Sequence, residues 1–158
     1  MRRTLASLII ALLAISLTGC GAGTSASTRN IKQVTDGVEA AITTDGNNIK
    51  LANVLVVATP EGAGVLVGTV INAMPEDDAL LGIAINGQVA TVTGSNTLAL
   101  NAPVIFEGPS ANAKAVVPAL GVKAGQNVQV TMFFAHAGEV TVIAVVRDQR
   151  DTYAGITA

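Results

Sequence analysis

Short apolar runs separated by turn residues dominate the sequence from residue 38 onward. The turns recur roughly every 8–12 residues, a spacing typical of antiparallel sheets. No stretch in this part of the chain places apolar residues at the 3.6-residue period of an amphipathic helix. The pattern therefore predicts an all-β fold, a single-domain antiparallel β-sandwich with Greek-key connections. The expected strands cover residues 38–43, 49–57, 64–72, 80–85, 88–93, 98–106, 113–120, 127–135 and 139–146.

Two local signals support this prediction. In the run 127–135, apolar residues occupy every second position from Val128 to Phe134, which gives one buried and one exposed face. The run 139–146 repeats the alternation. Asn86-Gly87 stands between two strand-like runs, and both residue types tolerate the positive φ that a two-residue hairpin turn requires. We therefore expect a tight β-hairpin at residues 86–87.

The only cysteine, Cys20, directly follows an N-terminal segment that is typical of export signals. Arg2 and Arg3 give a basic start, and residues 8–17 form an apolar core. This core is too short for a transmembrane helix, which needs about 20 apolar residues, but it fits a secretory signal peptide. Residues 17–20, Leu-Thr-Gly-Cys, resemble the lipobox of bacterial lipoproteins. That resemblance implies removal of residues 1–19 and a diacylglycerol on the Cys20 thiol.

The lipobox resemblance also sets the expected organisation of the chain. Residues 20–36 comprise the lipid-anchored cysteine and a small, polar, flexible tether, which at roughly 5–6 Å × √n spans about 20 Å. Residues 37–147 form the β-sandwich domain, and residues 148–158 form a polar tail that we expect to fray. Two acyl chains give stable anchoring where one does not. We therefore expect a protein on the extracytoplasmic face of the cell membrane.

Composition excludes several classes of function. With Cys20 acylated no thiol remains, which excludes a disulfide, a thiolate metal site and a cysteine nucleophile. Charged residues make up 13% of the chain and aromatic residues 3%, and the basic residues do not cluster. Nucleic-acid binding depends on a basic patch and stacking aromatic side chains. We therefore expect no nucleic-acid partner.

The sequence offers few candidates for catalysis or for binding hard ions. His136 is the only histidine, and neither Ser95 nor Ser110 lies in a Gly-x-Ser-x-Gly elbow. The acidic triplet 76–78 is expected to be a solvated turn, because a calcium site needs further oxygen ligands at defined spacing. The segment 62–64, Gly-Ala-Gly, is too short for a phosphate loop, and no helix is expected after it. We expect no catalytic residue, no cofactor and hence no enzyme.

Copper is the remaining metal to consider, because Met74, Met132 and His136 carry soft or borderline ligand atoms. Met132 and His136 would lie about 13 Å apart on one strand, at roughly 3.3 Å per residue, so one ion cannot bind both unless the chain turns sharply. Core packing explains Met132, and an exposed turn explains His136. We expect no metal ligands, with a three-residue copper site as the alternative.

Three segments in the second half resemble a known family. They are "GTVINAMPEDDALLGI" (68–83), "LGVKAGQNVQVTMFF" (120–134) and "AHAGEVTVIAVV" (135–146). The chain resembles the PCuAC-type copper-chaperone fold and, more closely, the related LpqE-type lipoproteins of actinobacteria. The resemblance implies a cupredoxin-like sandwich in the cell envelope.

The copper ligands of that family are not matched. Its copper-binding members carry a His and Met pair in the middle of the domain and a later His-x-Met, whereas segment 89–93 is "VATVT" and segment 106–117 is "FEGPSANAKAVV". We therefore expect a non-catalytic binding or accessory module in the envelope that supports respiratory or other envelope complexes. A respiratory oxidase is the family-level expectation for its partner. The alternative is a copper chaperone that delivers copper to a terminal oxidase through Met74, Met132 and His136.

Overall fold

The computed structural model describes residues 35–158, which form one compact unit. Cys20, the expected signal peptide and most of the expected tether lie outside the described residues. No helix in the described part is long and apolar enough to cross a membrane. The strands of the unit are β1 (Val38–Ile42), β2 (Ile49–Ala58), β3 (Gly64–Asn72), β4 (Asp78–Ile85), β5 (Gln88–Val89), β6 (Thr91–Gly94), β7 (Thr97–Leu98), β8 (Val104–Phe106), β9 (Ala113–Val117), β10 (Asn127–Phe134) and β11 (Glu139–Asp148).

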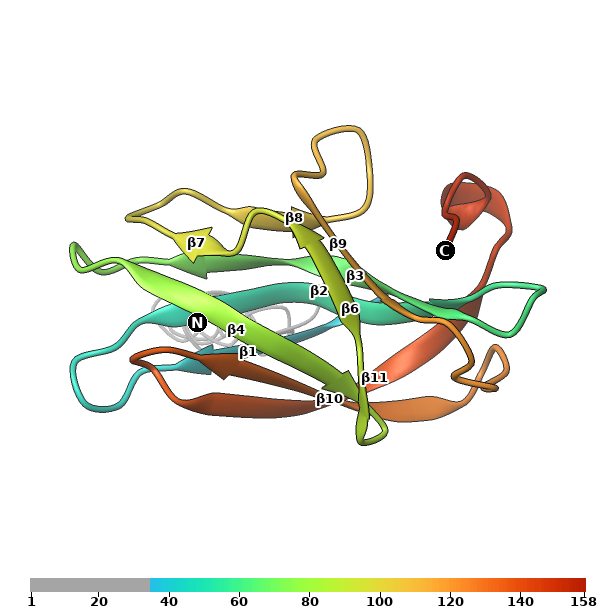
Figure 1. Cartoon of the computed structure of the whole chain (residues 1–158), viewed down its shortest axis with the longest axis horizontal. Helices are drawn as coiled ribbons and strands as arrows, with labels where there is room; N and C mark the ends of the chain where they lie inside the picture. The colour runs from blue at the N-terminus through green and yellow to red at the C-terminus, as the bar shows by residue number, and fades with distance from the viewer. Residues whose placement is uncertain (1–34) are drawn as a thin grey trace, which may run out of the picture. The chain divides into compact units, whose positions relative to one another are not determined.

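The strands form a curled sheet that encloses one core. They are hydrogen-bonded along the path β5-β4-β10-β11-β2-β3-β8-β9-β6, with β1 added at β2 and β7 at β4. Within residues 35–158 the ladders are antiparallel except for β11–β2 and β8–β9. Strands β4, β10 and β11 lie across the interior from β2, β3 and β8 (Figure 1). This arrangement confirms the predicted all-β sandwich.

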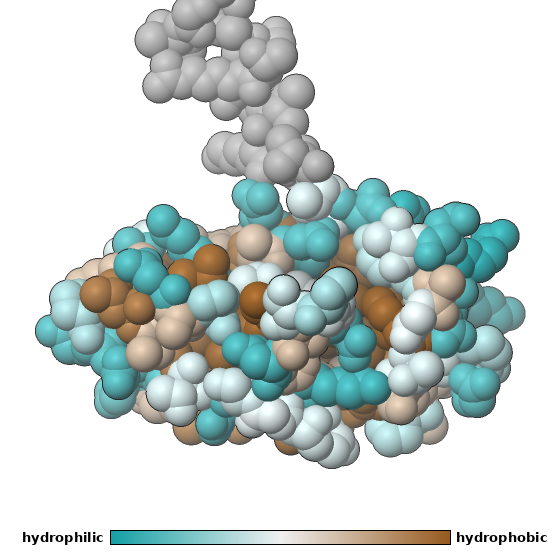
Figure 2. All heavy atoms as spheres, turned by 90° about the horizontal axis from the view of Figure 1, so that it is seen from above, coloured by the Kyte–Doolittle hydropathy of each residue, from teal (hydrophilic) through white to brown (hydrophobic). Residues whose placement is uncertain are grey.

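The main core lies between these two layers. Val128, Met132 and Phe134 of β10 are at most 4% exposed and belong to one apolar cluster with Val56 and Leu66 from the opposite layer. The strict alternation of β10 therefore predicts correctly which side chains point inward. On the surface seen in Figure 2, hydrophobic residues form separate small areas between hydrophilic and neutral ones.

Two expected strands are divided where the chain changes its partner. The run 88–93 becomes β5, paired with β4, and β6, paired with β9, and the buried Ala90 lies at the crossing between the layers. The run 98–106 becomes β7 and β8. Asn101, with a φ of 55°, and Pro103 lie in the break. A left-handed residue departs from regular strand geometry, and apolar alternation alone does not reveal such a break.

The C-terminal segment is not frayed, contrary to our expectation. A single 3₁₀ turn, η2 (Asp151–Tyr153), follows β11, and Ile156 is only 7% exposed. Ile156 packs in a second apolar cluster on the outer face of β2 and β3. These two strands are apolar on both faces, as in the continuous run 54–57. Strands of this kind need cover on both sides, which explains why the segment docks.

Candidate functional site

A pocket of about 520 Å³ opens at one end of the sandwich. The β1–β2 turn, the β3–β4 loop and the β10–β11 turn form it, and they meet at the left of Figure 1. The sheet order brings them together, because β2 pairs with β3 and β10 pairs with both β4 and β11. The lining includes Asp45, Asn47, Met74, Glu76, Asp77 and His136.

Asn72, the last residue of β3, fixes the β3–β4 loop. It is 1% exposed, and its Nδ2 donates hydrogen bonds to the carbonyl oxygens of Glu76 (2.7 Å) and Leu98 (2.9 Å). Its Oδ1 accepts a hydrogen bond from the N–H of Met74 (2.9 Å). Both amide hydrogens and the carbonyl oxygen are therefore used by the backbone. Asn72 holds the pocket wall and has no donor left for a ligand.

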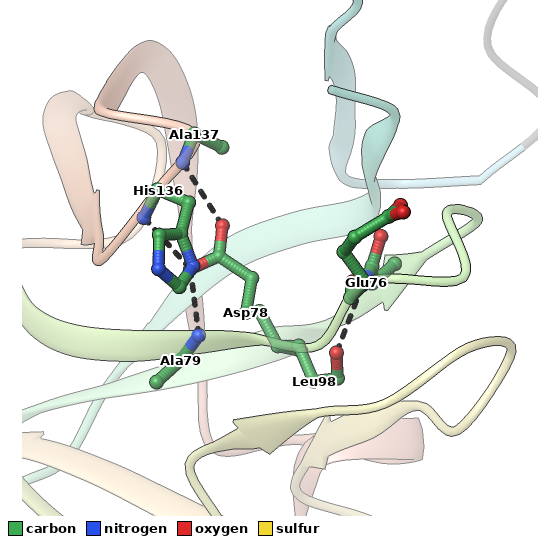
Figure 3. A network of polar contacts seen from close by, with 7 residues as sticks. Glu76, Asp78, Ala79, Leu98, His136 and Ala137 are labelled. Carbon is green, nitrogen blue, oxygen red and sulfur yellow. Dashed lines mark hydrogen bonds and ion pairs between the residues drawn. The ribbon is translucent and has the colours of Figure 1, made fainter. Parts of the chain in front are cut away.

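Asp78, the first residue of β4, binds the β10–β11 turn (Figure 3). Its Oδ1 accepts hydrogen bonds from the N–H groups of Ala79 (2.7 Å) and His136 (2.9 Å), and its Oδ2 accepts one from Ala137 (3.0 Å). The imidazole Nδ1 of His136 lies 3.5 Å from Asp78 Oδ1. The Asp78 side chain is 5% exposed and that of His136 is 74% exposed. A buried carboxylate thus lies against an accessible imidazole at the rim of the pocket.

The environment of Asp78 keeps its carboxyl ionised. Burial acts to raise its pKa, but hydrogen bonds from the backbone N–H groups of His136, Ala79 and Ala137 lower it. The nearby His136 lowers it further, so the pKa lies below the ordinary value of 3.8. Hydrogen bonds to the charged form of a carboxyl favour ionisation. At neutral pH this site therefore holds a fixed negative charge.

Three further features singled out in the sequence are the acidic triplet 76–78, the two serines and segment 62–64. Glu76 and Asp77 are exposed, as expected of a solvated turn. Asp78 is buried, because N–H groups of the β10–β11 turn donate to its carboxylate the hydrogen bonds that water would otherwise supply. Neither Ser95 nor Ser110 lines the pocket that His136 borders. In segment 62–64, Gly62 N–H donates a hydrogen bond to the carbonyl oxygen of Thr59 (3.0 Å), and Gly64 is already the first residue of β3.

The three soft side chains do not form one group. Met74 and His136 line the same pocket, whereas Met132 is 1% exposed and belongs to the core cluster. The sequence alternation that assigned Met132 to the core is thus correct. Among the described residues no three histidine, cysteine or carboxylate side chains are grouped closely enough to hold a metal ion. Of the two methionines considered for copper, only Met74 lines this pocket.

A second region joins segments 89–93 and 106–117, in which the sequence resemblance led us to look for copper ligands. Strands β6 and β9 pair with Thr93 opposite Lys114, so these segments are adjacent. The Lys114 Nζ lies 3.8 Å from Glu107 Oε1, and the hollow beside them is also lined by Asn112. These are hard oxygen ligands and an ammonium group, whereas thioether and imidazole groups are the ligands that suit copper. The residues present there do not fit a copper ion.

Comparison with known proteins identifies the fold. The apo PCuAC domain of PmoF1 has a TM-score of 0.57 and 17% identity, with 70% of this chain and 99% of that chain covered. The copper-bound PCuAC domain of PmoF2 has a TM-score of 0.58 and 20% identity, with 70% and 98% covered. The apo form of that domain has a TM-score of 0.54 and 20% identity, with 65% and 92% covered. No family model matches the chain, and no curated protein matches it. The chain therefore has the cupredoxin-like fold of PCuAC domains.

Sequence reasoning missed the roles of Asn72 and Asp78. Both lie in the segment 68–83 on which the family resemblance rests. The signal available in the sequence was position, because Asn72 ends one strand and Asp78 begins the next. Which distant groups they would bind depended on how the strands pair.

Proposed function

We propose that this chain is an exported, lipid-anchored protein of the LpqE type that acts as a non-catalytic binding or accessory module in the cell envelope. Cys20 carries the lipid, and the β-sandwich stands outside the cytoplasm on its tether. The module supports an envelope complex, with a respiratory oxidase as the partner to test first. The lipobox resemblance and the PCuAC fold support this proposal.

One observation favours an accessory role over copper delivery. In the β6–β9 region, the Lys114–Glu107 ion pair stands where the resembled family carries soft ligands. The ammonium group of Lys114 has no lone pair with which to bind a metal ion, and the pair offers no thioether or imidazole ligand. Compared with the copper-binding members of the resembled family, the chain keeps the fold but lacks the soft ligands. We expect this combination in a module that binds another protein and not a metal ion.

Chemical crosslinking in intact cells tests the accessory role. The tagged chain is crosslinked, purified and analysed by mass spectrometry for the partners it captures. We expect one envelope complex to be enriched over a control in which an unrelated lipoprotein carries the same tag. Equal recovery of all abundant envelope proteins by both chains would contradict a specific accessory role.

A copper chaperone that delivers copper to a terminal oxidase is the second candidate, and one observation favours it. The pocket places Met74 and His136 on one lining, and the buried Asp78 carboxylate lies beside Nδ1 of His136. Metal-binding histidines commonly have a carboxylate at the second ring nitrogen, which leaves the other nitrogen for the metal. Thioether and imidazole ligands together suit copper. Met132, part of the original three-residue alternative, is excluded by its place in the core.

Copper(I) titration against a chromophoric chelator separates the two candidates. If the pocket binds copper, His136→Ala and Met74→Leu should each weaken binding at least ~10-fold, the scale seen when metal-site partners are lost. Met132→Leu is the matched control, since it removes a thioether from the core while conserving volume. Wild-type protein that takes up no copper, or uptake that is unchanged in the first two variants, rules out the second candidate.

A further inference from the structure

The outer face of β2 and β3 is apolar although it points away from the main core. Leu55 pairs with Val67 and Val57 pairs with Val65 across the two strands. These four residues, the β2–β3 outer face, are between 0% and 8% exposed and form an apolar cluster separate from the main core. If it were uncovered, an apolar area of this kind would be typical of an interaction site. The burial of these four side chains therefore requires a segment that covers them.

A short segment after β11 supplies that cover. We call residues 149–158 the strap. Ile156 of the strap is buried in the cluster, and Tyr153 packs against it partly buried, beside Val116 and Val145 at the edges. The Tyr153 hydroxyl donates a hydrogen bond to Asp36 Oδ2 (3.2 Å), and Lys114 Nζ donates one to Thr157 Oγ1 (3.5 Å).

The strap is held weakly compared with the strands. One buried side chain, one partly buried side chain and three exposed side-chain hydrogen bonds, including one from Arg150 to Asp148, join it to the rest of the unit. Segments with few buried apolar contacts open locally without global unfolding. The strands beneath it, by contrast, pair through most of their length, with one irregularity between Ala52 and Leu55. Opening of the strap would expose an intact apolar face.

The turn that closes the strap contains a strained residue. Asp151 begins η2 with a φ of 50°, a left-handed conformation that is uncommon for residues other than glycine, although aspartate and asparagine adopt it more often than most. Arg150 just before it is extended, with a φ of −128° and a ψ of 163°. If the chain continued in an extended form through Asp151, this strain would be relieved and the strap would point away from its own sheet.

We propose that the strap of one chain can occupy the β2–β3 outer face of a second copy, giving a symmetric dimer by exchange. The segment shown to fit this face is Tyr153 to Ile156, and a second copy carries the same segment. Exchange can reproduce the contacts that Tyr153, Ile156 and Thr157 make with the rest of the unit. It gives up the hydrogen bonds of the turn at the hinge, from Tyr153 N–H to the Arg150 carbonyl oxygen and from Ala154 N–H to that of Asp151. Reciprocal exchange of an identical element is a low-cost route to two-fold dimers. This inference does not depend on the proposed function.

Substitutions at Asp151 test the exchange. Proline fixes φ near −65° and so excludes the turn that closes the strap on its own chain, while the extended Arg150 is compatible with a following proline. Asp151→Gly is the matched control, because glycine adopts positive φ freely. The double variant Asp151→Pro/Ile156→Asp also removes the apolar side chain that both the closed and the exchanged strap need.

Two measurements on the full-length chain in detergent give the outcome. Native mass spectrometry separates monomer from dimer. Tyr153 is the only tyrosine and the chain has no tryptophan, so acrylamide quenching of tyrosine fluorescence reports whether the strap is docked.

We expect Asp151→Pro to be mainly dimeric with Tyr153 as protected as in the wild type. Asp151→Gly should be monomeric with Tyr153 protected, and the double variant should be monomeric with Tyr153 quenched. A monomeric Asp151→Pro chain overturns the proposal, whether Tyr153 is protected or quenched. A dimer that persists in the double variant also overturns it, because something other than the strap would then hold the two copies together.

Discussion

Asp78 connects two parts of the chain that lie far apart in sequence. It starts β4, yet its carboxylate accepts hydrogen bonds from residues 58 and 59 positions later, in the β10–β11 turn. Together with Asn72 it fixes two of the three connections around the pocket. Buried polar side chains that are fully hydrogen-bonded specify one arrangement of the chain. The shape of the pocket therefore depends on these two residues more than on those that line its opening.

Replacing Asp78 with asparagine should destabilise the fold. The amide presents an N–H group where one carboxylate oxygen accepts a hydrogen bond, so a buried donor loses its partner at a cost of about 1–3 kcal/mol. Urea unfolding measures the loss. Asp77→Asn is the matched control in the same loop, and because Asp77 is exposed it should change the free energy of unfolding by less than about 0.5 kcal/mol. Equal effects of the two variants would contradict the role assigned to Asp78.

The same carboxylate should make stability depend on pH. The pKa of Asp78 in the folded protein lies below its ordinary value of 3.8, so the folded state binds a proton less readily than the unfolded state. Its contribution is therefore present in full above the unfolded-state pKa and is lost as the pH falls through the folded-state pKa. The urea midpoints of wild type and Asp78→Asn should differ at about pH 6, and the difference should shrink as the pH is lowered below 3.8. A constant difference across this range would argue against an ionised Asp78.

At the scale of elements, the β4–β5 hairpin is tied to the neighbouring strand β10. Asn86 and Gly87 both have positive φ, 49° and 76°, as a two-residue hairpin turn of the predicted type requires. Asn86 N–H also donates to the carbonyl oxygen of Gln129 (2.8 Å), and Gln129 N–H donates to Asn86 Oδ1 (2.9 Å). The turn thus sets the register of β5 and fastens the edge of the sheet.

Gly87→Ala should lower the free energy of unfolding by about 1 kcal/mol, the usual cost of a side chain at positive φ. An added Cβ meets no atom within 4 Å, so the cost is conformational and not steric. Gly82→Ala in β4 is the control, because its Cβ also meets open space but its φ is not positive. Thermal unfolding should show a lower midpoint for the first variant and an unchanged or higher one for the second. Equal shifts would mean that backbone strain at the turn is not the cause.

At the scale of the whole molecule, the proposed lipid anchor determines where the domain works. With the proposed anchor, a tether of about 20 Å would keep the sandwich close to the membrane, and its partners would then be the exposed parts of other envelope proteins. The two regions with side chains suited to binding are the pocket at one end and the β2–β3 outer face beneath the strap. Neither depends on the anchor for its shape.

Cys20→Ala should abolish processing and membrane anchoring. Because the thiol is the expected acylation site, the variant should accumulate as an uncleaved precursor with no covalent lipid. Mass spectrometry of the N-terminal peptide and partitioning into detergent measure these changes. Gly21→Ala is the control and should leave both unchanged. Normal cleavage and normal detergent partitioning of Cys20→Ala would refute the lipoprotein prediction.

The sequence alone predicted the fold class and nearly every strand. Its signals are local, since alternation every second residue, the Asn86-Gly87 pair and the turn residues act within a few positions. The same alternation assigned Met132 to the core. The runs 88–93 and 98–106 were each predicted as one strand, because apolar alternation does not record a change of partner.

Only the tertiary structure decided which distant segments meet. It placed Asp78 against the β10–β11 turn, Met74 beside His136 in one pocket, and the Lys114–Glu107 pair where β6 meets β9. It also showed that the polar segment after β11 covers an apolar face. The physical reason is that a strand's residue pattern states which side chains are buried, but not which strand lies beside it or what covers it.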